Sequence, residues 1–116
     1  MREDKKIAVM IATDVIGTGD ETLGRNLMKS YIYSLTEAEL KPTTIMFLNR
    51  GVYLTTKGSP VLELIKQLEN DGVEILSCGA CLDYYGLNDS LEAGNVTNMY
   101  SNVESMHELD NTIVIS

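Results

Sequence analysis

Short apolar runs alternate with segments of helical periodicity along this chain, and that alternation restricts the fold more than any other feature. Residues 7–12 form a continuous apolar run, which is typical of a strand buried on both faces. Further strands are expected at residues 43–48, 73–77 and 112–115, and the ambiguous residues 91–97 leave room for one more. Strands separated by helices at this spacing form right-handed βαβ units. We therefore expect an α/β fold, a three-layer α/β/α sandwich with a mostly parallel sheet of four or five strands.

Three longer helices are expected between these strands. Asp20 provides an N-cap for the first, and Ser59 with Pro60 opens the second. The apolar positions that recur at helical spacing are Leu23, Leu27, Met28, Tyr31 and Leu35 in the first helix, Val61, Leu64, Ile65 and Leu68 in the second, and Met99, Val103 and Met106 in the last. Each set gives its helix one apolar face, which we expect to pack against the sheet.

The length and charge of the chain limit its partners. Its 116 residues suit one domain, and we assign residues 1–116 to a single domain. Nine Lys and Arg residues against 17 Asp and Glu residues give a net charge of −8, which repels phosphate backbones and anionic bilayers. Residues 7–12 are the longest apolar run and are too few to span a membrane. We therefore expect neither a nucleic-acid partner nor a membrane partner.

The ends and the cysteines of the chain indicate its compartment. Residues 1–6 are charged, and no small-residue cleavage site follows the next apolar run, so no signal peptide is expected. The only two cysteines lie three positions apart, whereas a secreted protein stabilised by disulfides normally contains more. Both observations favour a reduced, cytoplasmic protein.

The predicted topology also locates a candidate site. Ligands of parallel α/β sheets bind beyond the carboxyl ends of the strands, where the loops at residues 13–20, 49–56 and 77–86 should meet. In the first loop, Gly17 and Gly19 are expected to form a tight turn that lines the site. In the second, Asn49 is placed to orient a ligand, while Arg50 is expected to be solvated.

The third loop contains the only stretch with evident chemistry, Ser77-Cys78-Gly79-Ala80-Cys81. Cys78 falls at the end of a buried strand, where a helix should begin, so backbone N–H groups should point at its sulfur and favour the reactive thiolate. Gly79 keeps the approach open. Cys81 follows one helical turn later and can share the same face. Tyr84 can cover the two sulfurs or pack in a subunit interface.

Several roles for Cys78 and Cys81 remain open on these residues alone. They can be packed core cysteines, a reversible dithiol pair or a carrier of persulfide sulfur. Zinc within one chain is disfavoured because one CxxC pair and a single distant His107 give too few ligands. The loop at residues 13–20 lacks the Lys-Ser/Thr of a P-loop. Flavin is a weak rival, since Thr13, Thr18 and Thr22 supply some of the hydroxyls that a flavin-phosphate loop offers. We expect no metal and no cofactor.

The segment from Cys78 to Leu87 reads CGACLDYYGL, and EAGNVTNMY follows it at residues 92–100. With Asn49-Arg50-Gly51-Val52 and Asp14…Gly17-Thr18-Gly19, it resembles the DsrE-like domain of YedF-type proteins, which are sulfurtransferase-like proteins linked to selenium metabolism. The resemblance covers nearly the whole chain. YedF-type proteins usually carry a small SirA/TusA-like carrier domain before this one. The 116 residues of this chain do not include it, which leaves open an excised domain or a stand-alone homologue with such a carrier domain as its partner.

The resemblance implies a flavodoxin-like fold and a homo-oligomer, commonly a trimer or hexamer, with cysteines near the subunit contacts. It also implies that Cys78 occupies the active position of sulfur-relay members, and that Cys81 is the additional cysteine of the YedF-type branch. We therefore expect a sulfur or selenium carrier that exchanges persulfide with donor and acceptor proteins. A non-enzymatic oligomeric binding module and a Cys78–Cys81 redox switch are the alternatives.

Overall fold

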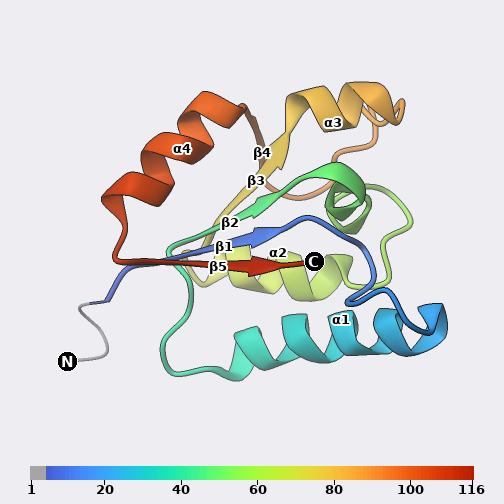
Figure 1. Ribbon diagram of the computed structural model, residues 1–116, viewed down its shortest axis with the longest axis horizontal. Helices are drawn as coiled ribbons and strands as arrows, with labels where there is room; N and C mark the ends of the chain where they lie inside the picture. Colours follow the sequence, from blue (N-terminus) through green and yellow to red (C-terminus); the bar gives the residue numbers. More distant parts are fainter. Residues whose placement is uncertain (1–4) are drawn as a thin grey trace.

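The fold is built on one five-stranded sheet in which every pair of neighbouring strands is parallel (Figure 1). The computed structural model describes residues 5–116. The strands are β1 (Ile7–Ile11), β2 (Thr44–Phe47), β3 (Glu74–Cys78), β4 (Asn95–Thr97) and β5 (Asn111–Ile115), in the order β4-β3-β2-β1-β5. The helices are α1 (Glu21–Glu37), α2 (Leu62–Asn70), α3 (Gly79–Tyr84) and α4 (Met99–Glu108), together with the 3-10 helix η2 (Asn49–Leu54). The α/β expectation and the parallel sheet are thus confirmed, with five strands.

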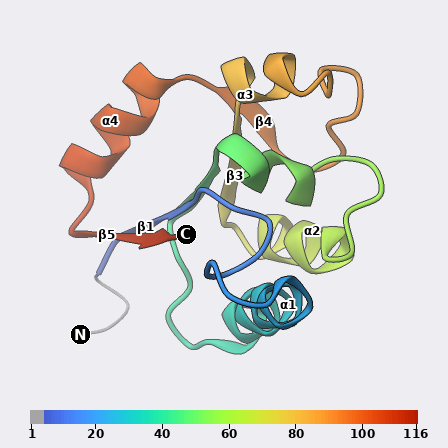
Figure 2. The same ribbon diagram turned by 45° about the vertical axis from the view of Figure 1, so that its right-hand side comes forward.

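The helices form two layers around the sheet. Helices α1 and α2 cover one face and α3 and α4 cover the other, as both ribbon views show (Figures 1 and 2). No helix among residues 5–116 is both long and apolar enough to cross a membrane. The expectation of no signal peptide rests partly on residues 1–4, which lie outside the described part of the chain.

The main core lies between the sheet and the α1–α2 layer. Its largest fully buried members alternate along the strands and recur along the helices: Val9, Ile11, Ile45, Phe47 and Ile75 from the sheet, and Met28, Ile32, Ile65 and Leu68 from the helices. Burial of each such side chain stabilises the fold by about 1.5–3 kcal/mol. This core holds the carboxyl ends of β1, β2 and β3 in one fixed arrangement.

The buried face of α1 differs from the expected one. Leu23 and Leu27 are 56% and 44% exposed, whereas Gly24 and Met28 are buried, followed by Ile32 and Thr36. A Cβ at position 24 would lie 2.8 Å from a backbone carbonyl in the preceding loop. The side of α1 that packs inward therefore begins at Gly24, and the apolarity of the side chains alone does not identify that side of the helix.

Two boundaries also differ from expectation. Helix α2 begins at Leu62, two residues after Pro60, because the Ser59 hydroxyl accepts the backbone N–H of Val61 at 3.2 Å and shapes a turn ahead of the helix. The segment after β2, expected as a loop, is the 3-10 helix η2. β4 lies within the segment that was ambiguous, residues 91–97.

Gly51 fixes the position of η2 against the end of β1. A Cβ built at Gly51 would lie 2.2 Å from the carbonyl oxygen of Ile11, so no larger residue fits without moving backbone. We predict that Gly51→Ala lowers the free energy of unfolding by about 1–3 kcal/mol, as overpacking typically does. Urea unfolding measures this. Gly19→Ala is the matched control, because nothing lies within 4 Å of its Cβ position; equal losses in both variants would contradict the packing argument.

Candidate functional site

Three loops meet at the carboxyl edge of the sheet, as the topology predicted. The backbone N–H of Asn49, after β2, donates to the Sγ of Cys81, after β3, at 3.1 Å. The guanidinium of Arg50 donates two hydrogen bonds of 3.1 Å to the carboxylate of Asp14, after β1. These contacts join residues that lie more than 30 positions apart in the sequence.

Both cysteines line one cavity of about 430 Å³ at this edge. The lining residues are Leu48, Asn49, Cys78, Ala80, Cys81, Tyr84, Tyr85 and Met99. The structure thus brings together four of the residues that the sequence indicated, namely Asn49, Cys78, Cys81 and Tyr84. Both thiols are free.

Cys78 is the last residue of β3 and the N-cap of α3, as expected. It is only 6% exposed. The expected backbone hydrogen bonds to its sulfur are not present among residues 5–116, since the Cys78 side chain makes no capping hydrogen bond at the start of α3. Gly79 lies against β4, where a Cβ would come within 3.0 Å of Val96 Cγ1. Its small size serves close packing rather than access to the sulfur.

Cys81 is the more exposed of the two cysteines. Its sulfur accepts the backbone N–H of Asn49, and no other backbone hydrogen bond to a sulfur of this cavity is found among the described residues. Burial raises the pKa of the Cys81 thiol, and the nearby Cys78 adds to that rise. The Asn49 N–H favours the thiolate and opposes the shift, but burial is the larger effect. Cys81 is therefore held mainly as a thiol at neutral pH.

Asn49 connects this sulfur to a tyrosine. Its φ is +49°, in the left-handed region that asparagine tolerates better than most residues. Its side-chain oxygen accepts a hydrogen bond of 2.5 Å from the Tyr85 hydroxyl. Asn49 thus places a backbone donor at Cys81 and anchors the tyrosine beside it.

Arg50 is solvated as expected, with a side chain that is 56% exposed, but two partners also hold it in place. Asp14 pairs with it through both carboxylate oxygens, and the Tyr53 ring lies under its guanidinium at 5.1 Å. The hydrogen bond and the charge of Asp14 raise the pKa of Arg50. Tyr53 in turn packs on Tyr85, with ring centroids 5.1 Å apart. A continuous wall therefore runs from Asp14 to the cysteine cavity.

The glycines of the first loop lie elsewhere. Gly17 has a φ of +84° and donates its N–H to the carbonyl of Ser116 at the end of β5. Gly19 precedes Asp20, which caps α1 by accepting the N–H of Leu23 at 2.8 Å. The turn and the cap are as predicted, but neither glycine lines the cysteine cavity.

Two residues lie near the cysteines that no sequence pattern placed there. Met99 was expected in a core stripe, yet it is 54% exposed and lines the cavity. Asn102 is fully buried one turn later, where its Oδ1 accepts the Thr97 hydroxyl and its Nδ2 has no partner among the described residues. Thr97 pairs with Cys78 in register, so their side chains share one face of the sheet. The β3–β4 pairing places the start of α4 beside the cysteine strand.

Metal-ligating side chains do not gather within residues 5–116, where no three His, Cys, Asp or Glu residues form a group. His107 is exposed in the last turn of α4 and is not among the residues that line the cysteine cavity. The chemistry that the cavity itself offers is that of two neighbouring thiols.

The chain belongs to the DsrE/DsrF-like family, whose model matches residues 5–115. Proteins of this family are generally components of sulfur relays. No protein among those with curated descriptions matches the chain.

Solved structures share the fold at low sequence identity. The ychN protein from E. coli is 13% identical, with a TM-score of 0.73 over 95% of this chain and 98% of that one. A protein of unknown function from Methanobacterium thermoautotrophicum is 19% identical, with a TM-score of 0.70 over 96% and 99%. A conserved protein of unknown function from Bacteroides thetaiotaomicron is 15% identical, with a TM-score of 0.64 over 95% of each chain. These similarities concern the fold.

The raised pKa of Cys81 gives a prediction about its reactivity. Only the thiolate is alkylated, so the alkylation rate of Cys81 in the folded chain should reach half its plateau at a higher pH than in the urea-unfolded chain. Pulse labelling with iodoacetamide, read by peptide mass spectrometry across a pH series, measures both midpoints. Each curve is normalised to its own plateau, which separates the pKa from steric hindrance. A midpoint lower in the folded chain would show that the Asn49 N–H outweighs burial.

Proposed function

We propose that this DsrE/DsrF-like protein carries sulfane sulfur as a persulfide on Cys78, with Cys81 as its neighbouring thiol. The observation that carries the proposal is the placement of two free cysteines on the wall of one open cavity at the carboxyl edge of the sheet. Membership of a family that generally works in sulfur relay supports it. The second cysteine further leads us to place the chain in the YedF-type branch, where selenium is the alternative cargo.

The loading step needs no cofactor. The Cys78 thiolate attacks the outer sulfur of a donor persulfide, R–S–SH, and a new S–S bond forms at Cys78. The donor's S–S bond breaks, and its inner sulfur leaves as a thiolate with the electron pair and then takes up a proton. Transfer to an acceptor thiolate repeats the same exchange, with Cys78 as the leaving group. No net oxidation or reduction of the protein occurs.

The two cysteines suit different parts of this cycle. Burial raises the pKa of Cys81, so at neutral pH it holds a proton that a leaving thiolate can take up. Cys78 is nearly buried, yet its side chain borders the cavity. A persulfide there would be reachable from the cavity and shielded from bulk thiols. Free thiols of this kind persist in a reducing compartment such as the cytoplasm.

The test is sulfur loading followed by mass spectrometry. The folded chain is exposed to glutathione persulfide, and peptides are analysed without reduction. We expect one added sulfur on the peptide containing Cys78 and Cys81, lost in Cys78→Ser and retained in Cys81→Ser. Circular dichroism establishes that both variants are folded.

The other outcomes assign other roles. Loading that survives in Cys78→Ser and disappears in Cys81→Ser would move the persulfide to Cys81. A Cys78–Cys81 disulfide as the only product would indicate a dithiol redox switch. Two unmodified thiols that also resist alkylation would contradict a carrier and favour a binding module.

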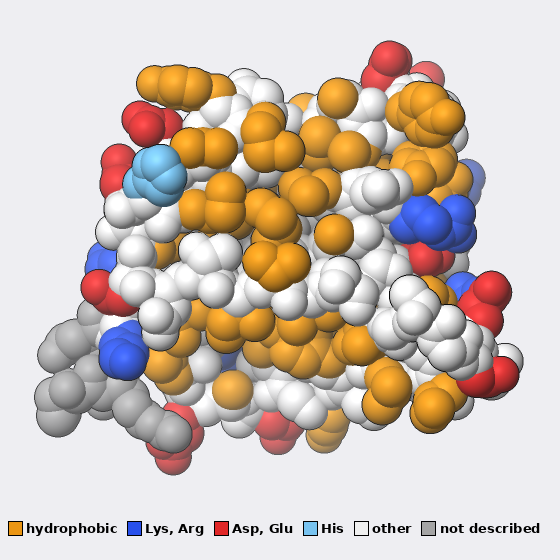
Figure 3. Space-filling model, viewed as in Figure 1, with side chains coloured by type: hydrophobic (Ala, Val, Ile, Leu, Met, Phe, Trp, Pro, Cys, Tyr) orange, Lys and Arg blue, Asp and Glu red, His pale blue; other side chains and the backbone are white. Residues whose placement is uncertain are grey.

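We also propose that the chain forms a homo-oligomer through the surface beside the cysteine cavity. Four large apolar side chains are exposed there: Tyr84 at 84%, Tyr100 at 75%, Val96 and Met99. Tyr84 and Met99 also line the cavity. Apolar side chains are spread over the α3–α4 layer in Figure 3. Exposed tyrosine and methionine are typical of protein interfaces, and such an interface would border the thiols.

Tyr100 provides the test of this interface. Tyr100→Asp places a charge in the apolar surface and should reduce the mass measured by light scattering from a trimer or hexamer to the 12.8 kDa chain. Tyr33→Asp is the matched control, because Tyr33 is an exposed tyrosine on α1, in the opposite layer. A wild-type chain that is monomeric at high concentration, or an assembly that only Tyr33→Asp disrupts, would contradict the assignment.

A further inference from the structure

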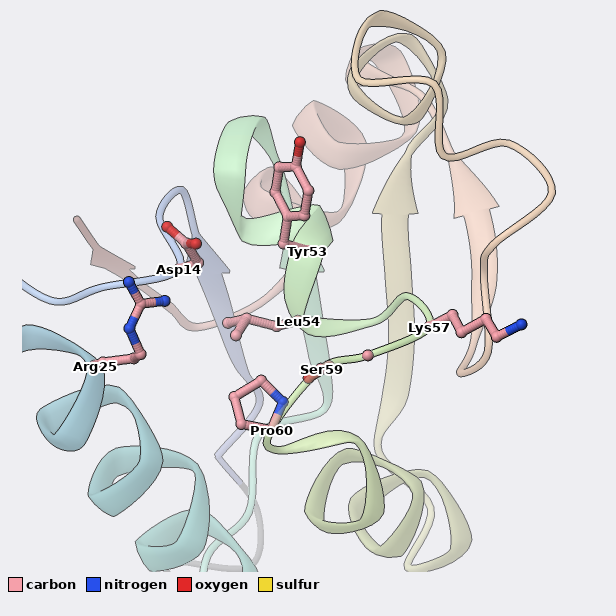
Figure 4. A pocket seen from close by; sticks show the side chains of 8 residues that line it. Asp14, Arg25, Tyr53, Leu54, Lys57, Ser59 and Pro60 are labelled. Carbon is pink, nitrogen blue, oxygen red and sulfur yellow. The ribbon is translucent and has the colours of Figure 1, made fainter. Parts of the chain in front are cut away.

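A second cavity, distinct from the cysteine cavity, lies between the first loop, η2 and the segment before α2 (Figure 4). Its volume is about 190 Å³. The lining residues are Asp14, Arg25, Tyr53, Leu54, Lys57, Gly58, Ser59 and Pro60. The proposed sulfur chemistry uses none of them.

Asp14 is a nearly buried carboxylate on the wall of this cavity, with a side chain that is 11% exposed. Arg50 occupies one acceptor position on each of its oxygens. An ionised carboxylate has about four such positions, so about two remain. Asp14 can therefore accept hydrogen bonds from a cationic group without giving up its partner.

Arg25 brings the opposite charge to the same cavity. One of its nitrogens donates to Glu21 at 2.6 Å, in a pair between exposed side chains one helical turn apart. Such surface pairs are weak, and a guanidinium has further N–H donors to offer. Figure 4 shows the Arg25 side chain extending from α1 toward the Asp14 carboxylate. Arg25 can thus bind an anionic group from inside the cavity.

The two charges line one cavity without pairing with each other. Asp14 pairs with Arg50, and Arg25 pairs with Glu21. No hydrogen bond or ion pair joins Asp14 to Arg25 in the described part of the chain, although both line the same cavity. The space between them is therefore suited to a molecule that presents a positive group to one and a negative group to the other.

We infer that this cavity binds a small zwitterion of the α-amino acid class. The ammonium group would contact Asp14 and the carboxylate would contact Arg25. A free anion would face the Asp14 charge and a free cation the Arg25 charge, so each is disfavoured. Leu54 and Pro60 offer an apolar wall to the side chain. Figure 4 shows the Lys57 side chain directed away from the other labelled groups, so it adds no further charge between them.

The volume limits the size of the ligand. Liquid water takes about 30 Å³ per molecule, so 190 Å³ corresponds to about six waters. Typical drug-sized ligands occupy cavities of about 300–1,000 Å³. The cavity therefore suits alanine, serine or cysteine rather than a nucleotide or a peptide. This inference stands whether or not Cys78 carries sulfur.

The test is calorimetric titration of the full chain with L-alanine and L-serine. Sodium propionate, ethylamine and inorganic phosphate present one charge sign each and serve as ligand controls. We expect saturable binding of an amino acid at least tenfold tighter than that of any single-charge compound. Phosphate binding as tightly as the amino acids would overturn the inference in favour of an anion site, and the absence of saturable binding by L-alanine and L-serine would overturn it outright.

Variants assign the binding to this cavity. Arg25→Gln changes an exposed side chain, so it should leave the fold intact and weaken amino-acid binding at least tenfold. Lys29→Gln removes a charge from the same helix outside the cavity and should leave the affinity unchanged. Asp14→Asn should also weaken binding, with a thermal melt to separate this effect from the loss of the Arg50 pair. Unchanged affinity in Arg25→Gln would overturn the inference.

Discussion

Everything at the functional edge of this protein depends on the parallel pairing of β1, β2 and β3. Parallel strands end at the same side of a sheet, so the segments that follow them must meet there. The register of β2 with β1 and β3 sets Phe47 beside both Ile11 and Ser77. This brings Asp14, Asn49 and Cys81 within reach of one another. The hydrogen bonds from Asn49 to Cys81 and from Arg50 to Asp14 are consequences of that register and not its cause.

The fold was largely predictable because its signals are local. The apolar run at residues 7–12, the Asp20 cap and the strand that ends at Cys78 each need only a few neighbouring residues to be identified. The face of α1 was missed for the opposite reason. Leu23 and Leu27 are as apolar as the residues that are buried, and the deciding feature is the close approach at Gly24 to a loop eight residues earlier. A hydrophobic periodicity in the sequence carries no information about that close approach.

The residues of the candidate site also fall into two groups: those that local sequence signals identify, and those whose position depends on contacts with distant parts of the chain. Asn49, Cys78, Cys81 and Tyr84 follow strands or stand beside the cysteines, and sequence reasoning found them. The ordering of Arg50 by Asp14 was missed, since it joins positions 36 apart and an arginine on a loop gives no sign of its partner. Met99 and Asn102 reach the cysteine strand through the three-residue β4, which was only an ambiguous segment. Gly17 and Gly19 were correctly placed at the carboxyl edge of the sheet. However, the carbonyl that accepts the hydrogen bond of the Gly17 N–H belongs to Ser116, which is 99 positions later in the sequence.

The packing around the two thiols would slow the formation of a persulfide and would also slow its loss. Burial withdraws water from sulfur and raises the pKa of Cys81, which slows any attack by its thiolate. The near-complete burial of Cys78 would likewise slow both the loading of sulfur from a small persulfide and its removal by a small thiol. A catalyst that must turn over quickly gains from an exposed thiolate, whereas a carrier gains from a protected one. The wall formed by Asn49, Tyr85 and Tyr53 stiffens this arrangement, because each member has a second contact that holds it. Under the proposed carrier function, this arrangement would favour holding sulfur between two partners over rapid turnover of a free substrate.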